Sequence, residues 1–593
     1  MTSAPNWNLE VVFEGGVTGP AFSAELTQLK AELEVLRERA GSLGGLEGNE
    51  DAWVTMLVDL AAIQDRMRSV SAFAHCHKAA DTTSEAIRLA AMAARELWSE
   101  LTMAWIPLNA GLLQADAAVF DGFVAREAMV PCEPQLRRIV DRAKIELKPE
   151  LQELAVEMDR EAVHAWGQLY DQISGKISAR LHLPGQDAVD VSVGVLNTYR
   201  SNGDEAVRKA AFEAATEAWT GVEDLCAATL SNLTGARQSR CKRIGCDEVA
   251  HSFFDNRVTP PLVEAMWHAA DHAQPKLIAY LDRKAKLLGK DKLDWWDLSA
   301  PVADSTDAGI SWDESRELIL DAFGGFSPQL RSFAIKAFDE QWIEAEKRAG
   351  KMQGGFCAGF VAERSSRIFM TWGDTLRSSM TLAHELGHAF HNDVILDAHP
   401  FRRSLTSCLA ETASTFGEAV FRDHALQNAS SDTTRLVMID QQLQAGVSFL
   451  MNIRARYIFE RELYTMRASG AFTAAQLTES MLRAQKSTYG DSLASWDSTF
   501  WTSKLHFYIS HFGFYNWPYT FGYLFSGAVY QRFLDEGDAF TPHYIDLLRR
   551  TGWDSCVNIG HASLGADLEQ PEFWINATGP LLRDVDTFLE LTE

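Results

Sequence analysis

The hydrophobic residues of this chain recur mainly at helical spacing. From about Phe22 onward, apolar positions return every three or four residues with charged residues between them, as at Leu26, Leu29, Leu33 and Leu36. Such spacing is typical of an amphipathic helix. Similar patterns occupy six further segments, 50–75, 83–115, 148–180, 203–235, 260–289 and 312–348, separated by glycine or proline breakers such as 41–45 and 260–261. The sequence therefore predicts an all-α fold, predominantly helical and without a fixed-period repeat.

One segment departs from this pattern. Glycines surround a β-favouring stretch within 351–372, which predicts a small sheet. Asp374 follows and is placed to cap a helix that runs through Phe390. Because residues 369–371 directly precede that helix, we expect them to form an edge strand that pairs with the backbone of a bound peptide.

The helix carries the sequence His384-Glu385-Leu386-Gly387-His388. Two imidazoles one helical turn apart face the same side and can share one tetrahedral zinc ion. Glu385 then lies beside the metal and can act as general base toward a water molecule that the zinc activates. The flanking residues are mostly small or apolar, which favours burial, and a buried histidine pair without a partner would be costly.

A catalytic zinc takes a third protein ligand. His391 lies too far along the helix axis from His384 to join the same ion, so we expect it to support the ligands indirectly. The following helix offers Glu411 and Glu418, seven residues apart on one face. One of these carboxylates can bind zinc while the other orients a ligand histidine.

A segment rich in aromatic residues, 506–526, is a third candidate for chemistry. Pro518 suits the first turn of a helix, which places Tyr519 and Tyr523 on one face. Their phenols, together with His511, can donate hydrogen bonds to the oxyanion that forms when a peptide bond is attacked. Packing in the core explains any one of these tyrosines equally well.

Composition narrows the classes of partner. The chain has 593 residues and a formal net charge of −26, which disfavours binding to nucleic acid or to anionic membranes. It begins without a signal-like segment, and its eight cysteines form neither a disulfide framework nor a CxxC metal site. The close pair Cys241 and Cys246 lacks a second pair at zinc-ribbon spacing. We therefore expect a cytoplasmic protein with reduced cysteines.

Three strings together resemble the oligoendopeptidase F branch of the thimet oligopeptidase family of zinc peptidases. They are HELGHAFH at 384–391, ETASTFGE at 411–418 and FYNWPYTFGYLF at 514–525. The resemblance extends over about 190–590, and it implies a helical N-terminal lobe at 1–190 and a zinc metallopeptidase domain at 191–593. It also implies a prolate two-lobed fold with a deep channel that admits oligopeptides.

The resemblance implies roles for individual residues. His384, His388 and Glu411 would bind one Zn²⁺ per chain, Glu385 would be the base, and Glu418 would support the ligands. His511 and Tyr523 would stabilise the oxyanion, with Tyr515 and Tyr519 as further catalytic candidates because the branches of the family space these tyrosines differently.

Two alternatives remain open at this point. A helical carboxypeptidase or an aminopeptidase can use the same His-Glu-x-x-His motif, although no Gly-x-Met-Glu-Asn string is present to bind a free α-amine. A catalytically inactive helical scaffold that binds peptides is the alternative from another class, and the presence of Glu385 argues against it. The sequence does not set the oligomeric state.

Overall fold

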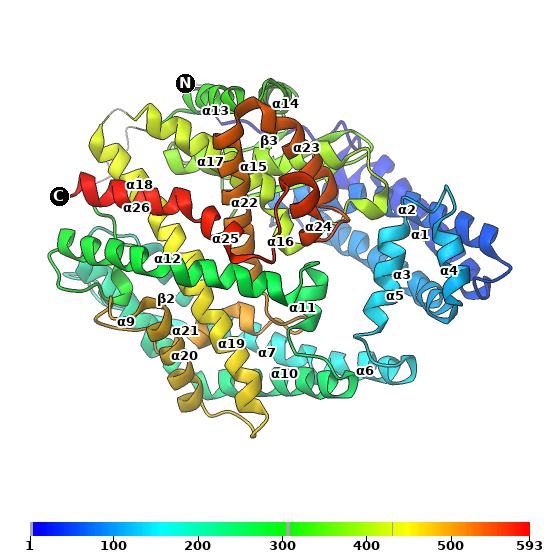
Figure 1. Ribbon diagram of the computed structural model, residues 1–593, viewed down its shortest axis with the longest axis horizontal. Helices are drawn as coiled ribbons and strands as arrows, with labels where there is room; N and C mark the ends of the chain where they lie inside the picture. Colours follow the sequence, from blue (N-terminus) through cyan, green and yellow to red (C-terminus); the bar gives the residue numbers. More distant parts are fainter. Residues whose placement is uncertain (1–3, 304–308, 430) are drawn as a thin grey trace. The chain divides into compact units, whose positions relative to one another are not determined.

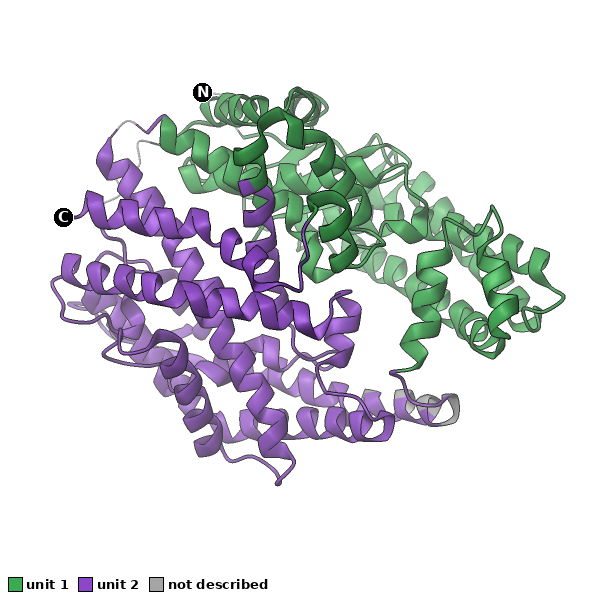
Figure 2. Cartoon of the chain, in the orientation of Figure 1, with its two compact units in different colours: residues 1–144, 307–427, 532–565 green, residues 145–306, 428–531, 566–593 purple. Residues whose placement is uncertain are grey.

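The computed structural model describes residues 4–303, 309–429 and 431–593. Helices predominate and the sheets are small, so the predicted fold class is confirmed (Figure 1). The chain forms two compact units (Figure 2): unit 1 contains residues 1–144, 307–427 and 532–565, and unit 2 contains residues 145–306, 428–531 and 566–593. Each unit is assembled from three separate stretches of the chain. The sequence predicts a different, sequential division into 1–190 and 191–593, which stays a prediction.

Unit 1 begins with three long helices whose apolar faces share one core. Leu29, Leu33 and Leu36 are fully buried there, which confirms the pattern that opens the sequence. The helices of unit 1 are α1 (Pro20–Ser42), α2 (Glu50–Ala80), α3 (Glu85–Gln114), α4 (Ala117–Val124), α5 (Glu133–Ala143), α13 (Trp312–Phe326), α14 (Pro328–Asp339), α15 (Leu376–Ile395), α16 (Ser407–Ala410), α17 (Thr412–Gln427), α23 (Thr541–Arg550) and α24 (Cys556–Ile559).

The predicted sheet is present in unit 1, but its edge is not where the sequence suggested. Its strands are β3 (Ile343–Glu344), β4 (Phe356–Phe360) and β5 (Ser365–Phe369), in the order β3-β5-β4. Phe369 pairs with Glu344 on one side and with Phe356 on the other, and Met370 donates to the carbonyl of Glu344. The expectation of an edge strand at 369–371 is therefore wrong, because a two-residue parallel strand distant in sequence covers that side.

Unit 2 is built almost entirely from helices, with one small hairpin. Its elements are α6 (Pro149–Ala162), α7 (His164–Lys176), β1 (Ser178–Leu181), β2 (Val189–Ser192), α8 (Val193–Leu196), α9 (Glu205–Thr220), α10 (Glu223–Ile244), α11 (Ala250–Asp255), α12 (Pro260–Leu287), α18 (Asp432–Val447), α19 (Ile453–Arg467), α20 (Ala474–Tyr489), α21 (Phe500–Ser503), most of α22 (Trp517–Glu536), α25 (Pro571–Ala577) and α26 (Gly579–Leu591).

Three of the predicted helical segments are each divided. The segment 312–348 becomes α13, α14 and β3, because Pro328 has no N–H to continue a helix and the Ser327 side chain caps the next one. Segment 203–235 divides at Gly221. Segment 148–180 divides at Val163, and strand β1 follows its second helix.

None of the helices in the described residues is long and apolar enough to cross a lipid bilayer.

Candidate metal centre

Helix α15 presents the two histidines of the motif to the same side. It begins at Leu376, where the side chain of Thr375 caps it by accepting from the backbone N–H of Ser378. Asp374 does not cap it, which corrects the prediction: its φ is 52° and its carboxylate accepts from the indole of Trp372. The Nε2 atoms of His384 and His388 lie 3.1 Å apart.

Glu411 lies at the break between α16 and α17. Its Oε2 atom is 3.3 Å from the Nε2 atom of His384 and 3.3 Å from that of His388. A tetrahedron with metal–ligand distances of about 2.0–2.1 Å has edges of about 3.3 Å. The three ligand atoms thus form one face of a tetrahedron of the size that zinc requires, and all three side chains are partly exposed.

Two glycines allow α15 and α17 to approach closely enough for this. A Cβ atom on Gly387 would lie 2.4 Å from the carbonyl oxygen of Ala413, and one on Gly417 would lie 2.8 Å from that of Ala383. Only glycine permits such contacts between the two backbones. The close approach of these helices carries Glu411 and Glu418 to the histidines.

Further contacts orient the ligand side chains. Glu418 accepts a hydrogen bond from Nδ1 of His384, which leaves the Nε2 lone pair of that ring for a metal. Ser414 donates to Oε2 of Glu411 at 2.7 Å. The sequence pointed to Glu418 but not to Ser414, which lies between the two glutamates and signals nothing by its residue type alone.

The charges of the cluster attract a cation. Burial disfavours a charge on His384, but its hydrogen bonds to Glu411 and Glu418 prevail and raise the pKa of this imidazole to about 10. Burial also opposes ionisation of Glu411, yet hydrogen bonds with the two histidines hold its pKa well below the usual range. Both shifts have the same cause, the close contact of carboxylates with the imidazoles, and such a group of charges attracts a cation.

Glu385 lies on the same helix as the two histidines and is 4% exposed. Its Oε2 atom is buried without a hydrogen-bond partner among the described residues, and burial raises the pKa of its carboxyl group. A buried carboxylate oxygen beside three ligand atoms fits a site that is completed by a metal and a water molecule. The residues present therefore fit a zinc ion.

His391 points to a different part of unit 1. It is fully buried, and its Nε2 atom lies 2.7 Å from the hydroxyl of Thr551, just beyond α23. Burial lowers the pKa of this imidazole to about 3, so the ring is neutral. The contact ties α15 to the residue that follows α23, and the predicted supporting role of His391 toward the ligands stays a prediction.

The aromatic candidates lie in unit 2. Tyr523 is on α22, where its ring stacks on Phe449 and its hydroxyl accepts from Gln442 at 3.2 Å. Tyr515 and Tyr519 make an edge contact, with ring centroids 5.7 Å apart. His511 is exposed, and its ring centroid lies 4.2 Å from that of His164, with the two rings tilted by 37°. Pro518 lies in the first turn of α22, as predicted.

The fold and this cluster define a predominantly helical protein with a His-Glu-x-x-His motif and a glutamate on an adjacent helix. Residues 331–579 match the model of peptidase family M3. The chain is 21% identical to oligopeptidase PepF of Bacillus subtilis over 95% of this chain and 84% of that protein. It is 19% identical to an oligoendopeptidase F homolog of Lactococcus lactis, over 97% and 95% of the two chains.

Solved structures share the fold. A Chlamydophila abortus protein superposes with a TM-score of 0.84 at 16% identity, over the whole of both chains. The oligoendopeptidase F of Enterococcus faecium gives a TM-score of 0.71 at 18% identity, over 96% of this chain and 98% of that one. The resemblance to the oligoendopeptidase F branch is thereby confirmed.

Proposed function

We propose that this protein is a zinc-dependent endopeptidase that hydrolyses internal bonds of short oligopeptides. The observation that carries the proposal is the set of three ligand atoms 3.1–3.3 Å apart beside the buried carboxylate of Glu385. The family M3 match and the names of the relatives, oligopeptidase and oligoendopeptidase, support a reaction on peptides.

In this proposal His384, His388 and Glu411 hold one Zn²⁺, with Glu418 fixing the orientation of His384. The bound ion supplies a Lewis acid that polarises the scissile carbonyl and lowers the pKa of water to about 7. Glu385 accepts the proton of the attacking water and later delivers it to the nitrogen of the departing amine. Burial, which raises the pKa of Glu385, favours the second step, because a carboxyl that ionises too readily is a poor acid.

The substrate backbone is proposed to pair with β4, which replaces the strand suggested by the sequence. No strand of the described residues covers the outer edge of β4. Gly355, the residue before that strand, lies so close to the proposed base that a Cβ there would be 2.9 Å from Oε1 of Glu385. Backbone pairing accepts many side chains. N-methylation of substrate amides near the cut should lower kcat/KM, and an unchanged value would refute this pairing.

Roles for the aromatic candidates are also part of the proposal. Tyr523 and His511 donate hydrogen bonds to the oxyanion that develops on the scissile carbonyl, and Tyr515 and Tyr519 are the further candidates for that role. A reducing, cytoplasmic setting is part of the proposal, because the eight cysteines of the sequence form no disulfide framework. The net charge of −26 disfavours nucleic acid and anionic membranes as partners.

Peptides of graded length with both ends blocked test the proposal. Mass spectrometry of the products should show internal cleavage that a chelator abolishes and added zinc restores. Cleavage only of peptides with a free terminus would instead identify an exopeptidase. No cleavage of any peptide by protein loaded with zinc would favour a binding scaffold.

A further inference from the structure

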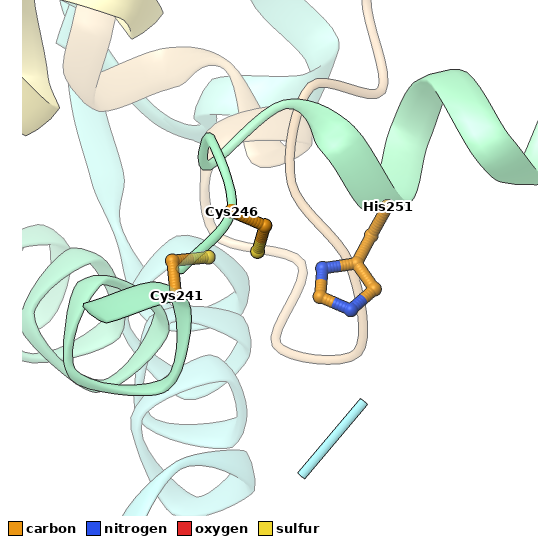
Figure 3. A group of neighbouring side chains, drawn as sticks. All are labelled: Cys241, Cys246 and His251. Atoms are coloured by element: carbon orange, nitrogen blue, oxygen red, sulfur yellow. The ribbon is translucent and has the colours of Figure 1, made fainter. Parts of the chain in front are cut away.

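A second group of metal-binding side chains lies in unit 2, at the end of α10. Cys241, Cys246 and His251 point toward one another there (Figure 3), and their ligand atoms all lie within 4.8 Å of one another. Cys241 is buried, whereas Cys246 and His251 are partly exposed. The sequence pattern is C-x₄-C-x₄-H, which differs from the paired spacings of a zinc ribbon.

A left-handed turn brings the two cysteines together. Gly245 ends α10 with a φ of 80°, a conformation that strongly favours glycine. The carbonyl of Cys241 accepts from the backbone N–H groups of both Gly245 and Cys246, at 2.7 and 3.1 Å. The chain thus reverses over the last turn of α10, and the Cys246 thiol comes to lie near the Cys241 thiol.

His251 is held in the orientation of a ligand. It lies in α11, and its Nε2 atom is 2.7 Å from the carbonyl oxygen of Ile145, to which it donates. The lone pair of this imidazole is then on Nδ1, which points toward Cys246 (Figure 3). Histidines that bind metals commonly donate their other N–H to a carbonyl in this way.

The nearest carboxylate, that of Asp247, does not occupy the place of a metal between the two cysteines and His251. It forms an ion pair with Arg461, at 2.5 and 3.1 Å, and is therefore engaged elsewhere.

A different acidic group of unit 2 is formed by Glu205, Asp294 and Asp297. It already surrounds the ammonium of Lys290 at 2.5–2.9 Å and needs no further cation.

We propose that Cys241, Cys246 and His251 bind a second Zn²⁺, in addition to the ion assigned to His384, with water as the fourth ligand. Two sulfurs and one imidazole nitrogen are a ligand set that selects zinc. Binding releases one proton from each thiol. With zinc–sulfur distances of about 2.3 Å, the ligand atoms would stand roughly 3.6–3.8 Å apart. Small rotations of the partly exposed side chains supply that closure.

The ion would clamp two helices that hold the segment carrying His511. On α10, Arg237 donates to the carbonyls of Ile509 and Phe512. On α11, Ser252 donates to the carbonyl of Phe514 and accepts from the indole of Trp517. A metal that joins α10 to α11 therefore stiffens this segment from both sides, and its effect on catalysis rests on the proposed function.

The test is metal analysis of the full-length chain together with substitution by Co²⁺, whose bonds to thiolates absorb in the near ultraviolet. The proposed site alone contains thiolates, so the wild type should bind two equivalents of metal and show this charge-transfer band. Cys246→Ser should bind one equivalent and lose the band. His251→Gln, a second variant in case the first fails to fold, should weaken the band and lower the affinity for cobalt.

Cys226→Ser, which alters another cysteine of α10, is the matched control and should retain the band and both equivalents. Glu411→Ala should lose one equivalent but keep the band, which separates this site from the proposed catalytic one. A single equivalent without a band in the wild type would overturn the proposal. So would a Cys241–Cys246 disulfide, seen as the loss of two hydrogens in the intact mass under non-reducing conditions.

Discussion

The candidate metal ligands of unit 1 and the aromatic segment of unit 2 are organised in different ways. In unit 1, two helices in backbone contact bring His384, His388 and Glu411 to within 3.3 Å of one another. In unit 2, the candidates lie along one stretch of chain, and neighbouring helices hold that stretch by its carbonyl groups. Loss of a ligand side chain in the first region should therefore remove metal, whereas damage to the second should slow the reaction and spare the metal.

The largest expected effect separates the two glutamates of unit 1. Glu411→Ala should lose the catalytic zinc and nearly all activity, because two imidazoles alone bind zinc weakly. Glu418→Ala removes only the partner of His384 and should weaken zinc binding or rate by about 10–100-fold. Metal content and kcat of the two variants check the order. The reverse ranking would transfer the role of ligand to Glu418.

Tyr523→Phe tests the other side of the comparison. If its phenol stabilises the oxyanion, kcat should fall by about 10²–10³-fold, because the contact is stronger in the transition state than with bound substrate. KM, zinc content and melting temperature should stay near wild-type values. A variant with full rate that is destabilised by about 1–3 kcal/mol would show that the hydroxyl only satisfies neighbours such as Gln442.

Gly387→Ala probes the helix contact that assembles the metal cluster. The new methyl group would lie 2.4 Å from the Ala413 carbonyl, so α15 and α17 must separate. We expect a loss of about 1–3 kcal/mol in stability and weaker zinc binding. Gly325→Ala on α13, where a Cβ meets no atom within 4 Å, is the matched control. Equal zinc affinity in the two variants would contradict the importance of this contact.

These helices also show where sequence reasoning succeeds and where it stops. The spacing of His384 and His388 is a local property of one helix, so it was predicted directly. The choice between Glu411 and Glu418 needed the family resemblance, because it depends on how Gly387 and Gly417 let two helices cross. The central position of β5 depends on β3, a two-residue strand too short to signal itself.

The pair Cys241 and Cys246 is a further feature that spacing rules do not describe. A search for two cysteine or histidine pairs at zinc-ribbon spacing misses a turn in which Gly245 reverses the chain and His251 supplies a third ligand. Such a group is recognisable in the sequence only once the left-handed end of α10 is expected at that glycine. Each unit also combines three separate stretches of the chain, and this arrangement depends on long-range packing that no local pattern signals.

The smallest expected effect on catalysis concerns Glu460, which supports the aromatic segment and makes stability depend on pH. Glu460 is buried and accepts from the backbone N–H of Phe514, at 2.6 Å. Burial raises its pKa to about 7 from 4.5. Between these values the unfolded chain ionises this carboxyl while the folded protein keeps its proton, so its contribution to the unfolding free energy falls as pH rises, by about 3 kcal/mol at most.

Glu460→Gln should remove that contribution. The stability of the variant relative to the wild type should therefore increase from pH 4.5 to pH 7 and stay constant above that range. Chemical denaturation at several pH values measures this difference. A difference that does not change with pH would mean that Glu460 ionises alike in the folded and unfolded chain.

The central claim is that Glu385 is the base beside a zinc ion held by His384, His388 and Glu411. Its most direct test measures the activity and zinc content of Glu385→Gln. The amide keeps the shape of the side chain but cannot accept a proton. We predict one equivalent of zinc retained at the His384 site and a loss of about 10³-fold or more in kcat, with Glu317→Gln on the exposed face of α13 as a control of wild-type activity. More than a tenth of the wild-type rate in Glu385→Gln, with zinc bound, would contradict the account.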